Sequence, residues 1–278
     1  MRRLAIPDGC VPWTSDFPTS QDGTASGVDA YKPPFYIAAV VAAGPVWADN
    51  WRERKTFQFN SVDGRVNRTS FEGHYTVDPH GSPLNPRGRT GLAGMGLLGR
   101  VGPNHAADPI VTRWQRTPDG ALVLGEDDQP VLEVVLIKRR DTGEWAIPGG
   151  MVEAGDTVGR TLSKEFGEEA LASLERGPAH AAALKAVIDR VFRSGGTLIY
   201  TGYVDDHRNT DNAWMETSVV NFHDPDGQTF GQLPLRAGDD AGDVAWVPAE
   251  PGMQLYASHA LFIDQVCQMR ARAWKPSP

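Results

Sequence analysis

The segment Pro148-Gly-Gly-Met-Val-Glu-Ala-Gly-Asp156 leads into Thr161-Leu-Ser-Lys-Glu-Phe-Gly-Glu-Glu-Ala170, and its apolar residues recur at helical spacing. This spacing predicts a helix from residue 157 to about residue 174. Four apolar residues share one face of such a helix: Leu162, Phe166, Ala170 and Leu174. Three carboxylates share the opposite face, where residues three and four apart are neighbours: Glu165, Glu168 and Glu169.

Like charges at this spacing repel one another, so the acidic face gains from a bound cation. Carboxylate oxygens suit Mg²⁺, which bridges protein carboxylates to substrate phosphates. A solvated surface helix is the alternative, and it is the better interpretation of the acidic residues taken alone. Gly167 favours the functional interpretation, because glycine within a helix costs about 0.5–1 kcal/mol relative to alanine.

Residues 110–278 have the alternating pattern of an α/β fold. Strands are expected at 110–114, 131–137, 144–147, 197–204, 214–222 and 244–247. Further helices are expected at 180–192 and from 258 to about 274. Residues 1–109 are rich in glycine and proline with short hydrophobic runs, and they are expected to form an irregular, β-rich lobe. The sequence therefore predicts two domains, 1–109 and 110–278.

The chain has 278 residues and a formal net charge of −8, which argues against a nucleic-acid partner. An acidic protein that handles a polyphosphate needs a local cluster of Arg and Lys or a bound divalent metal. The longest apolar run, residues 35–43, is much shorter than the roughly 20 residues of a membrane-spanning helix. No direct membrane insertion is therefore expected. Two cysteines do not make a disulfide framework, which fits a reducing compartment. No targeting segment is visible, which is compatible with a processed chain or with a domain of a larger protein.

The acidic segment resembles the Nudix hydrolase box, which has Gly, five residues, Glu, seven residues and then Arg-Glu-hydrophobic-x-Glu-Glu. This chain has Gly150, five residues, Asp156, seven residues and then Lys164-Glu-Phe-Gly-Glu-Glu169. The resemblance implies that Glu165, Glu168 and Glu169 are both the catalytic carboxylates and the metal ligands. Asp156 and Lys164 replace the Glu and Arg of the family, and Leu171 replaces a later Gly. Because Lys lacks the planar fork of Arg, these departures put the rate in question more than the reaction class.

Longer stretches resemble the mitochondrial-type ADP-ribose pyrophosphatases and the homologous C-terminal domain of melastatin-type ADP-ribose-gated cation channels. They run along nearly the whole chain and include Gly96-Leu-Leu-Gly-Arg-Val-Gly-Pro-Asn-His-Ala-Ala-Asp-Pro109 and Tyr203-Val-Asp-Asp-His-Arg-Asn-Thr-Asp-Asn-Ala-Trp-Met-Glu-Thr217. The resemblance implies a Nudix α/β/α sandwich with a smaller N-terminal domain that contributes to the substrate cleft. It also implies hydrolysis of ADP-ribose to AMP and ribose 5-phosphate with Mg²⁺, or alternatively Mn²⁺.

An alternative function is that of a sensor domain that binds ADP-ribose and controls an attached cation channel, with or without hydrolysis. The retained carboxylates favour an enzyme. Another ADP-sugar or a dinucleotide is an alternative substrate. We expect a cytoplasmic location, with the mitochondrial matrix and the cytosolic side of a membrane channel as alternatives.

The resemblance assigns substrate contacts to Asp206 and Arg208, which suit ribose hydroxyls. A solvated turn is an equally good interpretation of this loop. Further candidate contacts are Thr112, Ile147, Tyr256 and Ser258, although the first two residues are typical of strand packing and Ser258 of a helix N-cap. Three arginines of the N-terminal lobe could reach phosphates, but a surface role is the better expectation for each: Arg87, Arg89 and Arg100.

The general base that activates the attacking water has three candidates. A carboxylate from a late loop serves this role in several Nudix enzymes, which points to Asp240 in the acidic segment 239–243. Glu168 and Glu169 are the alternatives. No histidine or cysteine spacing typical of a zinc site is present in the sequence.

Overall fold

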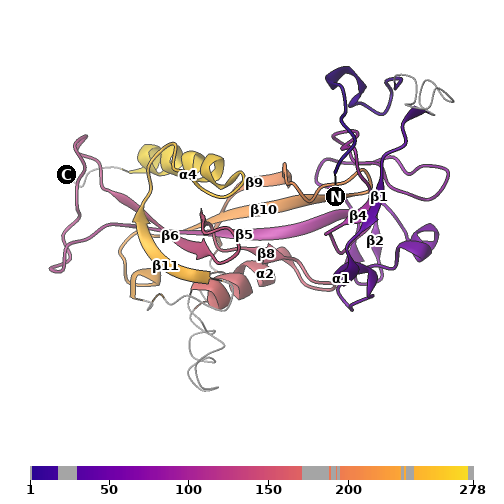
Figure 1. The fold of residues 1–278 in the computed structure, drawn as a ribbon. Coiled ribbons are helices and arrows are strands. Elements are labelled where there is room, and N and C mark those ends of the chain that lie inside the picture. Colours follow the sequence, from indigo (N-terminus) through magenta and orange to yellow (C-terminus); the bar gives the residue numbers. More distant parts are fainter. Residues whose placement is uncertain are drawn as a thin grey trace. The chain divides into compact units, whose positions relative to one another are not determined.

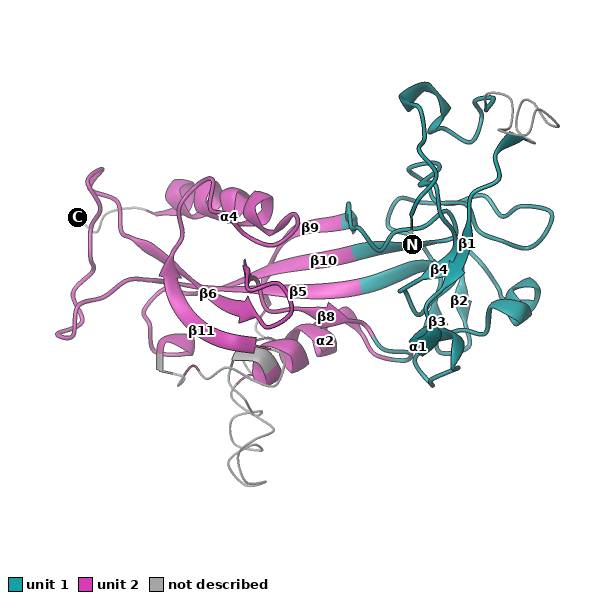
Figure 2. Cartoon of the chain, in the orientation of Figure 1, with its two compact units in different colours: residues 1–105, 153–155, 202–216 teal, residues 106–152, 156–201, 217–278 magenta. Residues whose placement is uncertain are grey.

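The computed structural model describes residues 2–17, 30–170, 188, 192, 195–232, 235 and 241–274. It divides the chain into two compact units (Figure 2). Unit 1 comprises residues 1–105, 153–155 and 202–216, and unit 2 comprises residues 106–152, 156–201 and 217–278. The domain boundary expected at residue 109 falls within a continuous strand, and it stays a prediction.

Seven strands among the described residues form the main sheet. The central order is β11 (Ala241–Pro248), β6 (Leu132–Arg139), β5 (Gly102–Trp114), β10 (Ala213–Asp224) and β9 (Thr197–Tyr203). The short strands β7 (Trp145–Ala146) and β8 (Gly150–Met151) pair with β6 and β5, respectively. β5 and β6 are antiparallel, with Thr112 opposite Val134, and β11 is antiparallel to β6.

Helices cover both faces of this sheet in unit 2, where α2 (Val158–Glu165) and α4 (His259–Ala273) lie on opposite sides (Figure 1). Successive strand residues point to opposite faces, so neighbours on β5 serve different cores. Val111 joins the cluster that contains Leu162 of α2, whereas Ile110 joins the cluster that contains Phe262 of α4. The predicted α/β/α sandwich is therefore confirmed.

Unit 1 has short strands and many turns, as the sequence predicted. β1 (Phe35–Ile37) pairs in parallel with β4 (Ala93–Gly96), and β2 (Val62–Asp63) forms a hairpin with β3 (Val66–Asn67). The helical segments whose bounds lie within the described residues are α1 (Ala39–Ala42) and two 3₁₀ helices, Asp8–Cys10 and Trp51–Thr56. A small core joins Ala38, Val41, Met95 and Val101.

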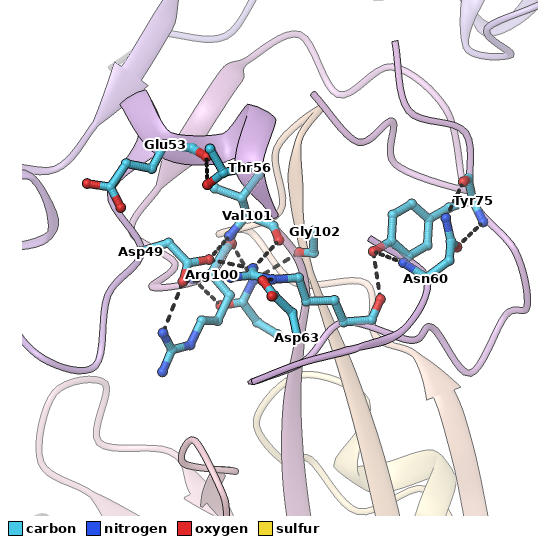
Figure 3. Close-up of polar contacts among 11 residues, drawn as sticks. Asp49, Glu53, Thr56, Asn60, Asp63, Tyr75, Arg100, Val101 and Gly102 are labelled. Atoms are coloured by element: carbon cyan, nitrogen blue, oxygen red, sulfur yellow. Dashed lines mark hydrogen bonds and ion pairs between the residues drawn. The ribbon is translucent and has the colours of Figure 1, made fainter. Parts of the chain in front are cut away.

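A buried cluster of charges supplements the small core of unit 1 (Figure 3). The Asp49 carboxylate accepts hydrogen bonds from Arg68 at 2.7 and 3.2 Å, from Arg100 at 3.1 Å and from the Val101 backbone at 2.9 Å. Arg68 also donates to Asp63 at 2.9 Å. Hydrogen bonding to every partner is what makes buried charge tolerable in a folded protein.

Two sequence predictions need adjustment. β5 begins at Gly102 rather than at Ile110, because buried pairing overrides the low strand propensity of its proline and asparagine. The predicted helix from residue 157 is α-helical only to Glu165 and continues as a π-helix over Phe166–Ala170. Most of the helix predicted at 180–192, and the first helix beyond residue 170, lie outside the described residues. No helix in the described ranges has the length and apolarity needed to cross a membrane.

Candidate active site

The glycine pair Gly149–Gly150 lies at the entry to β8, where Gly150 stands opposite Ala107 of β5. A Cβ built on Gly150 would lie 2.4 Å from the carboxyl carbon of Glu165 and 2.5 and 2.6 Å from its two oxygens. Real Cβ atoms do not approach other atoms so closely. Only glycine therefore allows the Glu165 carboxylate to lie against this stretch of backbone.

Glu165 ends α2, and Glu168 lies in the π-helix that follows. The helix starts at an N-cap, Thr157, whose hydroxyl accepts a hydrogen bond from the Arg160 backbone at 3.3 Å. Phe166 is fully buried, whereas Glu165 and Glu168 are partly exposed, as the predicted two-faced helix requires. Single π-turns within helices occur frequently at functional sites.

The donor chemistry of this helix fits a divalent cation. Glu165 and Glu168 offer the carboxylate oxygens that Mg²⁺ and Mn²⁺ take as ligands. The missing Cβ of Gly150 leaves the Glu165 carboxylate room beside the backbone. Glu169 belongs to the same π-helix, but its side chain is outside the described residues. Among the side chains that are described, no three His, Cys, Asp or Glu groups form a ligand set, so the predicted triad stays a prediction.

Asp156, the box residue that replaces the family Glu, pairs with Arg160 one helical turn further on. Its Oδ1 lies 3.3 Å from Nη1 of Arg160, whose side chain is largely exposed. The exposed position of Arg160 makes this a weak ion pair. The role of Lys164 as a substitute for the family Arg stays a prediction.

Asp206 and Arg208 are held together in the loop after β9, within unit 1. Arg208 donates from Nε to Oδ1 at 2.8 Å, from Nη2 to Oδ2 at 2.7 Å and from its backbone N–H to Oδ1 at 2.8 Å. Burial raises the pKa of the Asp206 carboxyl, but the Arg208 hydrogen bonds and charge outweigh burial and hold it below its usual value. The two side chains therefore form a bidentate ion pair, and their contact with a ribose stays a prediction.

Ile147, Tyr256 and Ser258 come together at the start of α4. The backbone N–H of Ile147 donates to Nδ1 of His259 at 3.0 Å, and Tyr256 N–H donates to the Trp145 carbonyl at 2.9 Å. The Ile147 side chain is buried in the core. Ser258 occupies the N-cap position, but its side chain makes no capping hydrogen bond. The structure thus gathers three of the four candidate contacts predicted in unit 2.

His259 belongs to this cluster and was missed by sequence reasoning. Burial lowers its pKa to about 4, and the Arg139 charge acts in the same direction. Its Nδ1 accepts a hydrogen bond, which requires the neutral ring with the proton on Nε2. The Arg139 guanidinium also stacks over Tyr256, 4.3 Å from the ring centre. The sequence signal for His259 was its position next to Ser258, one of the predicted substrate contacts.

Thr112, the fourth candidate in unit 2, is fully buried on β5. Its hydroxyl accepts a hydrogen bond from Nδ2 of Asn221 at 2.9 Å and lies 3.0 Å from Nδ1 of His223. Asn221 in turn accepts a hydrogen bond from Arg270 of α4 at 2.9 Å. This network describes a packing role for Thr112, and its contact with a substrate stays a prediction.

The arginines of the N-terminal lobe make contacts within unit 1. Arg89 is buried, and its Nη1 donates to the carbonyls of Cys10, Pro12 and Ser15 at 2.7, 2.7 and 3.0 Å. Arg87 is largely exposed and pairs with Glu72 at 2.8 Å. The surface role expected for Arg89 is therefore wrong, because its guanidinium organises the N-terminal loop. Asp240, the nominated general base, lies outside the described residues.

Comparison with protein-family models gives two matches that together span most of the chain. Residues 6–102 match the NUDT9-like N-terminal domain, and residues 114–261 match the NUDIX domain.

Three curated relatives extend this likeness. The rat mitochondrial ADP-ribose pyrophosphatase is 48% identical over 99% of this chain and 76% of its own length. The putative nudix hydrolase 6 of Caenorhabditis elegans is 45% identical over 95% of this chain and 90% of its own length. A transient receptor potential cation channel subfamily M member-like 2 of Nematostella vectensis is 48% identical over 98% of this chain, which spans only 17% of that protein.

Proposed function

The chain belongs to the Nudix hydrolase family, and from this membership we propose that it hydrolyses ADP-ribose to AMP and ribose 5-phosphate with Mg²⁺. The observation that carries the proposal is the Glu165 carboxylate in the space left by Gly150, within a chain that is 48% identical to an ADP-ribose pyrophosphatase over 99% of its length. Nudix hydrolases depend on divalent metals, and Mn²⁺ is the alternative ion.

Three carboxylates hold the metal in this proposal: Glu165, Glu168 and Glu169. When bound, the cation neutralises the diphosphate, polarises a phosphorus–oxygen bond and lowers the pKa of the attacking water. Water then attacks one phosphorus, the anhydride bond breaks, and the products leave as AMP and ribose 5-phosphate. The proton of the attacking water goes to a carboxylate base, for which Asp240, Glu168 and Glu169 are the candidates.

The remaining candidates bind the substrate in this proposal. Asp206 and Arg208, fixed to each other by two side-chain hydrogen bonds, orient the hydroxyls of the terminal ribose. Ile147, Tyr256 and Ser258, which meet at the start of α4, contribute contacts to the nucleotide or its ribose, together with Thr112.

An ADP-ribose sensor in a larger channel is the alternative function, and one observation favours it. Cation channel proteins are among the relatives, and the chain spans 17% of their length. A sensor would need the binding contacts but not the acidic helix. The proposal of an enzyme therefore depends on the three box glutamates, which the chain retains. We propose a cytoplasmic location; the mitochondrial matrix is the alternative for an enzyme, and the cytosolic side of a membrane channel is the alternative for a sensor.

The test is incubation of the purified chain with ADP-ribose and Mg²⁺, followed by chromatographic separation of the nucleotides. We expect AMP, and we expect it to disappear on chelation and in Glu165→Gln and Glu169→Gln. Glu250→Gln, which neutralises an exposed carboxylate of unit 2, is the matched control and should keep full activity.

Two outcomes contradict the proposal. Binding of ADP-ribose without AMP formation would identify a sensor. Full activity of Glu169→Gln would rule out the proposed metal site. Parallel incubations with another ADP-sugar and with a dinucleotide establish the substrate, since a faster reaction with either one would replace ADP-ribose.

A further inference from the structure

A buried acid, Asp108, lies in β5 directly behind the glycine pair of the candidate active site. The residue is 8% exposed. One carboxylate oxygen, Oδ2, accepts a hydrogen bond from the Thr217 hydroxyl of β10 at 2.6 Å, and Thr217 is itself buried. A buried carboxylate needs such hydrogen bonds to offset the loss of water. The side chain of Asp108 is therefore fixed by the neighbouring strand.

The other oxygen of Asp108 lies against Gly149. A Cβ built on Gly149 would come 2.0 Å from Oδ1 and 3.0 Å from Cγ of Asp108. No residue other than glycine fits beside this carboxylate unless the Asp108 side chain, the strand or the turn shifts. Asp108 therefore contacts both Thr217 of β10, through a hydrogen bond, and the backbone of Gly149, which precedes β8.

A second carboxylate contacts the same turn one residue later, because Glu165 lies against Gly150. Two consecutive glycines are therefore each in close contact with an acid, one from the sheet and one from the helix. The strand pairing fixes this arrangement, because Ala107, the neighbour of Asp108, stands opposite Gly150. A displacement of the turn would move the surface against which Glu165 lies.

We infer that Asp108, held by Thr217, is a positioning residue that fixes the Gly149–Gly150 turn and thereby the orientation of the Glu165 carboxylate toward a divalent cation. This inference rests on the proposed function, because it assumes that Glu165 is a metal ligand. Residues that orient metal ligands typically change metal affinity or activity by about 10–100-fold when they are altered.

The test measures Mn²⁺ binding to the full chain without ADP-ribose, by the electron paramagnetic resonance signal of the free ion. Thr217→Val removes the hydroxyl that holds Asp108, and Asp108→Asn removes the charge. We expect both variants to bind Mn²⁺ about tenfold more weakly than the unaltered chain. Thr217→Ser retains the hydroxyl and should restore the affinity.

Ser218→Ala is the matched control. Ser218 is buried on the same strand, and its hydroxyl lies 3.3 Å from that of Thr201, so this change also removes one buried hydroxyl. It should leave Mn²⁺ affinity unchanged. If Thr217→Val lowers the melting temperature as Ser218→Ala does, but binds Mn²⁺ as tightly as the unaltered chain, Asp108 only stabilises the fold and the inference is wrong. Thr217→Val keeps this test decisive even if Asp108→Asn fails to fold.

Failure of the inference can be distinguished from failure of the proposed function. If the chain binds Mn²⁺ with the expected dependence on Thr217 but releases no AMP, the proposed reaction is wrong and the positioning role of Asp108 is supported. A chain that releases AMP, with Mn²⁺ affinity unaffected by Thr217→Val, would keep the reaction and lose the positioning role. Absence of Mn²⁺ binding by the unaltered chain would overturn the inference directly.

Discussion

The Glu165 carboxylate fills the space that a side chain on Gly150 would need, with its carboxyl carbon 2.4 Å from the position of the missing Cβ. These two residues belong to different elements, since Gly150 begins β8 and Glu165 ends α2. Their contact gives a physical reason for a glycine at the first position of the box. The glycine is needed for close approach, because the helix must bring a carboxylate against the strand backbone.

Gly150→Ala should therefore reduce the rate of AMP formation by about 100-fold, because displacement of a catalytic group by about 1 Å can cost that much. The new methyl group would push the Glu165 carboxylate away from the turn. The measurement is kcat for ADP-ribose at saturating Mg²⁺, with circular dichroism to show that the variant is folded.

Gly159→Ala is the control for this substitution. Gly159 is exposed in α2, and a Cβ built there meets no atom within 4 Å. Alanine should raise the free energy of unfolding by about 0.5–1 kcal/mol through its higher helix propensity and leave kcat unchanged. Equal activity of the Gly150 and Gly159 variants would mean that the contact with Glu165 has no catalytic importance.

The order of strands and helices around the box could largely be predicted from the sequence. The strand expected at 110–114 is part of β5, and Ile110 and Val111 are both core residues. The first residue of β5 could not be predicted. Its first residues include Pro103 and Asn104, whose low strand propensity is overcome by burial and pairing that no local pattern records.

The candidate site was predictable only in part. The spacing of the box glutamates identified the acidic helix. The predicted faces, however, assume α-helical geometry throughout, whereas the chain changes to a π-helix at Phe166. His259 and Asp108 were missed because a single buried polar residue gives no periodic signal in the sequence. Their positions depend on contacts with Ile147 and Thr217, which are distant in the sequence.

Asp49→Asn should destabilise the protein by about 3–5 kcal/mol, because it leaves the buried Arg68 without its main counter-charge. The measurement is urea unfolding followed by tryptophan fluorescence. Asp78→Asn is the comparison. The Asp78 side chain accepts two backbone hydrogen bonds, from His80 and Ser82, and these donors are not a buried arginine side chain. A smaller loss of stability at Asp49 than at Asp78 would contradict the role of the charge cluster.

Arg208→Lys should raise the KM for ADP-ribose by about tenfold with little change in kcat, because lysine cannot reproduce the bidentate fork that holds Asp206. The steady-state kinetics of this variant should be compared with those of Asp205→Asn, which alters an exposed acid in the same loop. If Arg208→Lys lowers only the melting temperature and leaves KM unchanged, the pair stabilises the loop and does not bind ribose.

His259 should make the stability of the protein depend on pH in a defined direction. Burial lowers its pKa in the folded chain to about 4, whereas an unfolded histidine titrates near 6.5. Between these values the unfolded chain binds a proton that the native chain does not. The free energy of unfolding therefore falls as the pH is lowered from about 6.5 to 4, by up to about 1.4 kcal/mol per pH unit for this residue.

His259→Asn removes the titration but keeps an acceptor for the Ile147 N–H, so the loss of stability between pH 6.5 and 4 should be smaller than in the unaltered chain. Part of the dependence should remain, because burial also lowers the pKa of His223 to about 4. Urea unfolding at several pH values provides the measurement, and His74→Asn, at an exposed histidine, should follow the unaltered chain. If His259→Asn shows the same pH dependence as the unaltered chain, His259 binds protons equally in the folded and unfolded states. The assignment of a neutral, hydrogen-bonded His259 ring would then be wrong.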